Sequence, residues 1–309
     1  MNKTAILFLI FNRPETTKRV FDAIKKYQPK KLYLAADGPR SDKIGEKELC
    51  QKTRAIVNEI DWDCEVSTLF REKNLGLKVA VSSAIDWFFK NENEGIILED
   101  DCLPNPTFFR YCSELLEKYR NVDQVKMISG DNFQFGWKNS DDSYYFSKYC
   151  NIWGWATWKR AWKEYDLEMK SYPEFVKSNK IDQVFKDKSV RRYWRAVLDR
   201  VFSAEINTWD YQWVFCVWSH NGLAINPSIN LVANLGCNSG TNTAGQENSE
   251  VADMKSYAMK FPLKHPTSIS QSVEADDRFS SQFFKTSYFG LIVSKAKRFV
   301  VKYSHFRKK

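Results

Sequence analysis

The sequence predicts an α/β fold with a mostly parallel, doubly wound sheet. Short apolar runs alternate with segments of helical spacing four times within the first 130 residues. The run at residues 5–11 is apolar throughout, as expected of a parallel strand that is buried on both faces. Polar residues follow the ends of these runs, at the sheet edge where ligands bind in open α/β folds.

The elements of the first half follow from apolar spacing and from turn residues. The first helix, for example, places Val20, Phe21 and Ile24 on one side. The expected strands are residues 5–11, 31–36, 64–70, 96–98 and 125–129. The expected helices are residues 16–27 and 46–60, one that follows the turn at 73–77 and ends near residue 89, and residues 104–119.

The second half has a different character. Residues 151–158, which we call the aromatic block, are rich in Trp and interrupted by Gly154. We expect an aromatic helix that is opened by 208–213, a strand at 224–232 and a polar loop at 234–249. Shorter helical stretches are expected near residues 161–165, 173–176 and 190–202. We therefore divide the chain into a first half (1–130), a second half of the same domain (131–250), and a C-terminal extension (251–309).

Composition narrows the class of protein. The 309 residues have 43% hydrophobic content and a net charge of +9, which suits nucleic acid, anionic membranes or phosphorylated ligands. The seven cysteines include no CxxC pair, which favours a reduced, cytoplasmic protein. The run at residues 5–11 is too short for a membrane span, and no small-residue cleavage site follows it, so we expect neither a transmembrane helix nor a signal peptide. There is no glycine-rich phosphate loop, which argues against NAD enzymes and P-loop NTPases.

Three adjacent acids, Glu99, Asp100 and Asp101, directly follow the expected strand at 96–98. Such a triplet repels itself unless a cation neutralises it, and Mg²⁺ and Mn²⁺ prefer carboxylate oxygens together with substrate phosphates. A solvated acidic turn is the alternative. Asn12-Arg13 and Asp37 follow other strands of the same expected sheet. Polar residues from several strands at one sheet edge favour a binding site over a solvated turn.

Several motifs together resemble one family. They are Asn12-Arg13-Pro14, Asp37-Gly38, Asn74-Leu75-Gly76, Glu99-Asp100-Asp101, Trp153-Gly154-Trp155 and Trp209-Asp210. In this order the chain resembles a GT-A-fold (Rossmann-like) nucleotide-diphospho-sugar glycosyltransferase. It is similar to N-acetylglucosaminyltransferase I and to bacterial surface-glycan glycosyltransferases. Each motif is weak alone, and together they span roughly residues 4 to 245. The resemblance implies that residues 1–130 form a nucleotide-sugar-binding half and residues 131–250 an acceptor and catalytic half of the same domain.

The resemblance implies roles for the acidic and nucleotide-side residues. Asp101 would hold the divalent metal, Mn²⁺ or Mg²⁺, and Asp100 would lie near the nucleotide ribose. Asn12, Arg13 and Asp37, with Asn74, would line the uridine and phosphate pocket, and the Arg13 guanidinium suits a diphosphate. The alternatives are a surface charge for Arg13, a turn cap for Asp37 and a left-handed turn residue for Asn74.

The same resemblance implies roles on the acceptor side. Asp210 would be the general base that deprotonates the attacking hydroxyl. Trp209 and Trp213 would keep Asp210 partly dehydrated, which raises its pKa. Trp153 and Trp155, with Trp209, would border the sugar or acceptor pocket. Asp210 could instead be an N-terminal helix residue favoured by the helix dipole, and core packing is the alternative for at least one Trp.

One position departs from the family pattern. Relatives often carry His where Asn242 stands, and a late His is a metal ligand in many GT-A enzymes. The sequence leaves open whether Asn242 or His220 completes the metal site, although a lone His is more often structural.

These observations lead to an expected function. We expect an inverting, metal-dependent transferase that moves a sugar from a UDP-sugar to a glycan or lipid-linked acceptor, in surface polysaccharide or lipopolysaccharide synthesis. The alternative is a non-catalytic carbohydrate- or nucleotide-sugar-binding protein of the same fold. Nucleic acid is not an expected partner, because the basic excess lies largely in the tail. Residues 285–309 have the pattern of a basic amphipathic helix, which would suit an anionic membrane surface at the inner face of the membrane.

Overall fold

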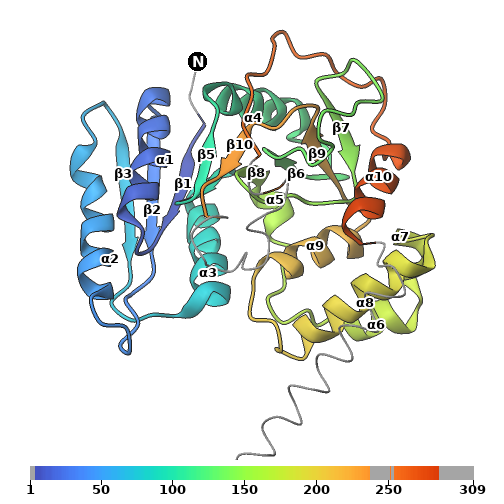
Figure 1. Cartoon of the computed structure of the whole chain (residues 1–309), viewed down its shortest axis with the longest axis horizontal. Helices are drawn as coiled ribbons and strands as arrows, with labels where there is room; N and C mark the ends of the chain where they lie inside the picture. Colours follow the sequence, from blue (N-terminus) through green and yellow to red (C-terminus); the bar gives the residue numbers. More distant parts are fainter. Residues whose placement is uncertain (1–3, 237–250, 252–253, 285–309) are drawn as a thin grey trace, which may run out of the picture.

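A mostly parallel eight-stranded sheet forms the centre of the molecule (Figure 1). The computed structural model describes residues 4–236, 251 and 254–284. The strand order is β3-β2-β1-β4-β8-β6-β9-β7, in which β7 and β8 run antiparallel to their neighbours. The strands are β1 (Ile6–Ile10), β2 (Lys31–Ala36), β3 (Glu65–Phe70), β4 (Glu94–Glu99), β6 (Val125–Ser129), β7 (Tyr144–Ser147), β8 (Trp155–Trp158) and β9 (Leu223–Pro227). The predicted α/β class with a mostly parallel sheet is confirmed.

Helices cover both faces of the sheet, and further helices form a layer beside it. The first group is α1 (Pro14–Tyr27), α2 (Glu46–Arg54), the 3-10 helix η1 (Ala55–Glu59), α3 (Gly76–Asn91) and α4 (Pro106–Tyr119). The second group is α5 (Lys159–Trp162), α6 (Tyr172–Lys177), α7 (Lys180–Val184), α8 (Lys188–Phe202), α9 (Asp210–Ser219) and α10 (Val273–Phe283). The helix expected at 46–60 is therefore an α-helix followed by a 3-10 turn.

A second, two-stranded sheet pairs β5 (Cys102–Pro104) with β10 (Val232–Asn234). Helix α4 consequently starts at Pro106, two residues later than expected. Asn105 caps it by accepting a hydrogen bond from the Thr107 backbone N–H at 3.1 Å. The single strand expected at 224–232 is wrong, because β9 ends at Pro227 and the chain resumes pairing only at β10.

The end of the aromatic block is a central strand, which the sequence did not predict. β8 pairs antiparallel with both β4 and β6 and separates them. All four of its residues are buried. Its residues therefore alternate between the two core layers, with Trp155 in one and Trp158 in the other.

Three apolar clusters make the core. Residues of β1 alternate between two of them: Ile6, Phe8 and Ile10 pack with α1 and α4, while Leu7 and Leu9 pack with α3 and α9. The third cluster joins α6, α7, α8 and α9. The sheet itself is continuous across both halves of the chain, since β6 pairs with β8 and β9.

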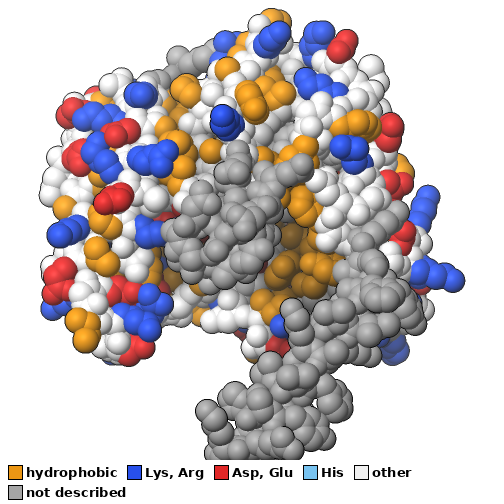
Figure 2. All heavy atoms as spheres, viewed as in Figure 1, with side chains coloured by type: hydrophobic (Ala, Val, Ile, Leu, Met, Phe, Trp, Pro, Cys, Tyr) orange, Lys and Arg blue, Asp and Glu red, His pale blue; other side chains and the backbone are white. Residues whose placement is uncertain are grey.

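The surface carries charges of both signs. On the face shown in Figure 2, Lys and Arg side chains are interspersed with Asp and Glu. Within the described ranges, no helix is both long and apolar enough to cross a bilayer. Six cysteines of this part of the chain are free thiols. The amphipathic helix expected at 285–309 lies outside the described residues, as does nearly all of the polar loop expected at 234–249.

Candidate functional site

Arg13 joins the acidic triplet at the carboxyl end of the sheet. β1 and β4 are parallel neighbours, so the residues that follow them meet at one edge. The Arg13 guanidinium lies 2.8 Å from Asp100 Oδ1 and 2.8 Å from Asp101 Oδ2. Asp100 also accepts a hydrogen bond from the Phe11 backbone N–H at 3.2 Å. Asp100 and Asp101 thus share one cation, and the Glu99 carboxyl forms no hydrogen bond or ion pair within the described residues.

The triplet holds more negative charge than Arg13 neutralises. Burial, together with the charges of Asp101, Asp100 and Asp210, raises the pKa of Glu99 to about 8, although the Arg13 charge opposes that rise. Burial also raises the pKa of Asp100 to about 7, although the Arg13 charge opposes that rise. Three carboxyls beside one guanidinium favour a further cation, and their oxygen donors fit Mg²⁺ or Mn²⁺. A site completed by substrate phosphates needs only one or two of these carboxylates.

The segment that leaves β10 passes directly over Asp101. The Leu235 backbone N–H donates to the Asp101 carbonyl at 2.7 Å. A Cβ on Gly236 would lie 2.3 Å from Asp101 Oδ2 and 3.1 Å from the Arg13 guanidinium, so any larger residue there would displace the Asp101 carboxylate. The next residue, 237, begins a stretch outside the described part of the chain, and Asn242 lies within that stretch.

Asp37 and Asn74 join the loops that follow β2 and β3. Asp37 Oδ2 accepts hydrogen bonds from the backbone N–H groups of Leu75 and Gly76, each at 3.0 Å, at the start of α3. Asn74 donates to the Gly38 carbonyl at 2.7 Å. Both side chains therefore hold the loops in place. Their predicted contact with a nucleotide stays a prediction.

Asn12 leads to a pair that the sequence analysis missed. Its side chain donates to Glu46 Oε1 at 2.9 Å. Glu46 is almost fully buried and forms an ion pair with Arg40, whose guanidinium lowers the pKa of that carboxyl. Arg40 also lies over the Phe11 ring, 5.7 Å from its centroid. Arg40 follows the Asp37-Gly38-Pro39 turn at the end of β2, which was the signal available in the sequence.

Asp210 stands at the first turn of α9 and close to the triplet. Its charge is one of the causes that raise the pKa of Glu99. Its Oδ1 accepts hydrogen bonds from the Thr208 hydroxyl and from the Tyr211 backbone N–H. Protein encloses the carboxylate on most sides without closing it fully to solvent, and this burial raises the pKa of Asp210. The structure thus brings the candidate base and the acidic triplet to one place.

The tryptophans predicted for the pocket have different surroundings. Trp155 and Trp209 are 1% and 2% exposed and stack on each other, with ring centroids 5.8 Å apart. Trp213 is fully buried beside them. Trp153 is the partly exposed one, and its ring packs edge-on against Phe133 at 5.2 Å. Of these four rings, only Trp153 presents surface to a ligand, while the others support the wall from behind.

His220 does not stand near the acidic triplet. It follows the ten-residue helix α9 and lies about 15 Å along that helix from Asp210. Its Nδ1 is 3.8 Å from Glu164 Oε2 and 3.9 Å from Cys216 Sγ, and Lys126 Nζ lies 2.7 Å from the same Glu164 oxygen. The idea that His220 completes the metal site at Asp101 is therefore wrong. Within the described residues, Glu164, Cys216 and His220 form the one group of three side chains of metal-ligand type whose donor atoms lie close together.

Comparisons with known proteins give no family assignment. No family model matches the sequence, and no curated protein matches it. Similar solved structures include HddC from Yersinia pseudotuberculosis, at 11% identity over 56% of this chain and 86% of that chain, with a TM-score of 0.34. Another is the mannosyltransferase PcManGT from Pyrobaculum calidifontis in complex with GDP-Man and Mn²⁺, at 11% identity over 51% and 45%, with a TM-score of 0.36.

A third similar structure is the apo-form glycosyltransferase GlyE of Streptococcus pneumoniae TIGR4, at 14% identity over 60% of this chain and 39% of that chain, with a TM-score of 0.25. The chain spans less than half the length of GlyE and of PcManGT. These likenesses are too weak to carry an argument, so the function is argued from the geometry of the site.

Proposed function

We propose that the chain is an inverting, metal-dependent glycosyltransferase of the GT-A fold that uses a UDP-sugar. One observation carries the proposal. Asp210 on α9 follows Trp209, whose ring stacks on Trp155 of β8, and Trp155 pairs with Ile97, two residues before Glu99. The Asp210 charge accordingly contributes to the raised pKa of Glu99. An anion-binding group, Arg13, contacts the same triplet through Asp100 and Asp101. Sugar transfer needs these two parts, a holder for the leaving diphosphate and a base for the attacking hydroxyl.

The donor side uses Arg13 and Asp101. Arg13 offers a planar guanidinium at the sheet edge, which suits a diphosphate. Asp101, with Glu99 nearby, would hold a divalent ion, which when bound neutralises negative charge on the leaving diphosphate. Asn12, Asp37, Asn74 and Asp100 keep their proposed place around the nucleotide. The loops that carry Asp37 and Asn74 are tied together by the hydrogen bonds at Gly38 and Gly76.

The acceptor side uses Asp210. Both hydrogen bonds described above go to its Oδ1, so Oδ2 would accept the proton from the acceptor hydroxyl. Burial raises the pKa of this carboxyl and thereby makes the carboxylate a stronger base. The exposed surface of Trp153 would border the sugar. Trp155 and Trp209 would act from the core, by fixing the start of α9.

We place this activity in the cytoplasm, on a glycan or lipid-linked acceptor for surface polysaccharide or lipopolysaccharide. The free thiols of the described cysteines are in keeping with a reducing compartment. The basic amphipathic pattern of residues 285–309 supports contact with an anionic membrane. Removal of residues 285–309 should abolish co-sedimentation with vesicles that contain anionic lipid. Unchanged co-sedimentation would contradict the membrane contact alone.

The function is tested by separating binding from turnover. The wild type should bind UDP in the presence of Mn²⁺ by calorimetry and release UDP from one member of a panel of UDP-sugars. Asp210→Asn should keep UDP binding and lower turnover by about 10²–10⁴-fold, the range for loss of a general base. Asp141→Asn removes an exposed carboxylate and is the matched control. Unchanged turnover in Asp210→Asn would show that Asp210 is not the base. If UDP binds but no UDP-sugar is turned over, the non-catalytic alternative holds.

A further inference from the structure

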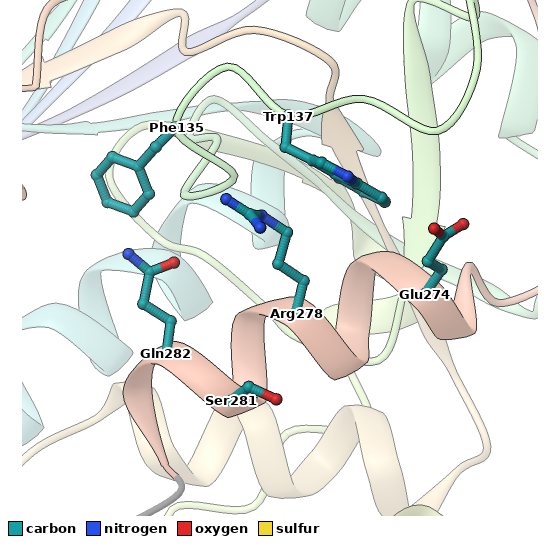
Figure 3. A pocket seen from close by; sticks show the side chains of 6 residues that line it. All are labelled: Phe135, Trp137, Glu274, Arg278, Ser281 and Gln282. Atoms are coloured by element: carbon teal, nitrogen blue, oxygen red, sulfur yellow. The ribbon is translucent and has the colours of Figure 1, made fainter.

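An open hollow lies between α10 and the loop that follows β6. Its volume is about 730 Å³, within the range of roughly 300–1,000 Å³ that is usual for ligand sites. Figure 3 shows Phe135 and Trp137 on the loop above α10, with the Arg278 side chain rising between them. The lining residues are Phe135, Trp137, Glu274, Arg278, Ser281 and Gln282. The four residues of α10 share one side of that helix, since Arg278, Ser281 and Gln282 come four, seven and eight positions after Glu274.

Direct contacts fix the loop to the helix, so the hollow is formed before any ligand arrives. Gln134 Nε2 donates to the Ala275 carbonyl at 2.9 Å. Asn139 Nδ2 donates to the Ser272 hydroxyl at 2.9 Å. Phe133 adds ring contacts to α10, with its centroid 5.8 Å from that of Phe283. The loop is held at several points along its length, which preserves the distance between its aromatic rings and the α10 side chains.

The backbone of the loop is strained where it presents its aromatic rings. Phe135 has φ of 49° and Gly136 has φ of 85°, both in the left-handed region. A bulky residue rarely adopts this conformation, and such strain tends to occur at functional sites. The ring of Trp137 lies next to the Arg278 guanidinium, 5.7 Å from its carbon to the ring centroid. The turn therefore directs two aromatic side chains toward one cationic side chain.

The hollow belongs to the same sheet edge as the proposed catalytic site. β4 and β6 run in the same direction, because each is antiparallel to β8 between them. The loop after β6 therefore starts at the edge where the triplet after β4 lies. Asp131, in that loop, accepts a hydrogen bond from the Trp153 backbone N–H at 2.9 Å. The Trp153 ring contacts Phe133, and Phe133 contacts Phe283, which leads from the proposed sugar pocket toward the hollow.

The residues that line the hollow combine the two kinds of contact that carbohydrates make. Sugars present apolar C–H faces that pack on aromatic rings, together with hydroxyls that need several polar partners. The hollow offers two aromatic rings together with a guanidinium, a carboxylate, an amide and a hydroxyl. Within the described residues, the side chains of Arg278 and Glu274 form no ion pair and no hydrogen bond, so their polar groups are available to a ligand. The opposite charges of these two side chains favour a neutral ligand over a strongly anionic one.

We propose that this hollow binds an outer part of an oligosaccharide acceptor, one or more sugars away from the hydroxyl that is glycosylated. The proposal rests on the proposed function for the origin of the oligosaccharide, while binding itself is measured without donor. Phe135, Trp137 and Arg278 recognise the outer sugars. The enzyme consequently favours longer acceptors over their terminal mono- or disaccharides.

The test uses the full chain on an array of bacterial surface oligosaccharides of increasing length, with no nucleotide present. The wild type should bind longer members more tightly than their shorter fragments. Trp137→Ala and Arg278→Ala should each weaken that binding by about tenfold or more, the effect of losing one aromatic or charged contact. Tyr257→Ala and Arg192→Ala remove an exposed aromatic and an exposed arginine elsewhere, and should leave it unchanged.

A second readout separates this inference from the catalytic one. Acceptor-independent UDP-sugar hydrolysis should be the same in Trp137→Ala, Arg278→Ala and the wild type, and it also reports that both variants are folded. The inference is overturned if no array member binds the wild type, or if the variants bind as the wild type does. If array binding depends on Trp137 while hydrolysis is missing from every protein, the carbohydrate site stands and the glycosyltransferase proposal fails.

Discussion

Arg13→Met should lower the stability of the folded protein, because it leaves the carboxylates of the acidic triplet without their cation. The substitution keeps a long apolar side chain but removes the guanidinium that is shared by Asp100 and Asp101. Removing one partner of a buried ion pair costs about 3–5 kcal/mol, whereas exposed pairs contribute about 0–1 kcal/mol. The side chains of Arg13, Asp100 and Asp101 are 28%, 4% and 15% exposed, which lies between these limits. We therefore expect a loss of about 2–3 kcal/mol in the free energy of unfolding at pH 7.

The loss should depend on pH in a defined direction. The Arg13 charge lowers the pKa of Glu99 and of Asp100, and both pKa values are already raised by burial. Without Arg13, both folded-state pKa values rise further, while the unfolded-state values stay near 4. The folded variant then holds more protons than the folded wild type at neutral pH, so its stability falls more steeply as pH rises. The difference between variant and wild type should be larger at pH 8 than at pH 5.

Urea unfolding followed by tryptophan fluorescence measures this difference. Lys18→Met is the matched control, because Lys18 pairs with Asp22 and Glu59 on an exposed surface. If Arg13→Met loses no more stability than Lys18→Met, or loses the same amount at pH 5 and pH 8, the electrostatic reasoning is refuted. Added Mn²⁺ should raise the Tm of Arg13→Met more than that of the wild type. Arg13→Met combined with Asp101→Asn should lose that additional stabilisation.

Three further predictions concern stability. Asp276→Asn should lose about 1–3 kcal/mol, because the amide NH₂ would replace either Oδ1, which accepts from the Ser147 hydroxyl, or Oδ2, which accepts from the Lys148 N–H and the Gln271 amide. Its stability should also fall less steeply than that of the wild type as pH rises from 4 to 6, since burial raises the folded pKa of Asp276 to about 6. Equal slopes in the variant and the wild type would contradict this. Gly38→Ala should lose about 1–3 kcal/mol in urea unfolding, because its Cβ would lie 2.3 Å from the Lys73 carbonyl carbon, while Lys73→Ala should be neutral. Trp155→Ala should lose about 3–5 kcal/mol and Trp153→Ala far less, and equal losses would mean that both rings are core.

The parallel half of the fold could be predicted because its local and tertiary signals agree. β1 and β2 are apolar runs with both faces covered, and their flanking turns contain Pro and Gly. These two local signals were enough to predict both strands. β8 could not be found in this way. Trp155–Trp158 is only four residues long, and its aromatic content is equally typical of a pocket wall. Its place between β4 and β6 depends on pairing with strands more than twenty residues away, which no local pattern encodes.

The candidate site was predictable in its location and less so in its contacts. Strand ends placed Arg13, Asp37 and the triplet at one edge, and the structure puts them there. The sequence could not show which partner each side chain chooses. The Asp37 carboxylate accepts hydrogen bonds from backbone N–H groups at the start of α3. This contact arises only when the loops after β2 and β3 meet. Residue types at strand ends therefore indicate a site, whereas the packing of neighbouring loops decides which groups remain available within it.

Arg13 shows why that distinction matters for mechanism. The family resemblance gives Arg13 to the diphosphate and Asp101 to the metal, as if the two were independent. In the structure they are bonded to each other at 2.8 Å. A diphosphate can gain the Arg13 guanidinium only if Asp100 and Asp101 release it, and a buried carboxylate without its cation is costly. A divalent ion at Asp101 removes that cost, so occupation of the metal site and release of Arg13 favour each other. Ligand binding at this edge is thus an exchange of partners among charges that are already present.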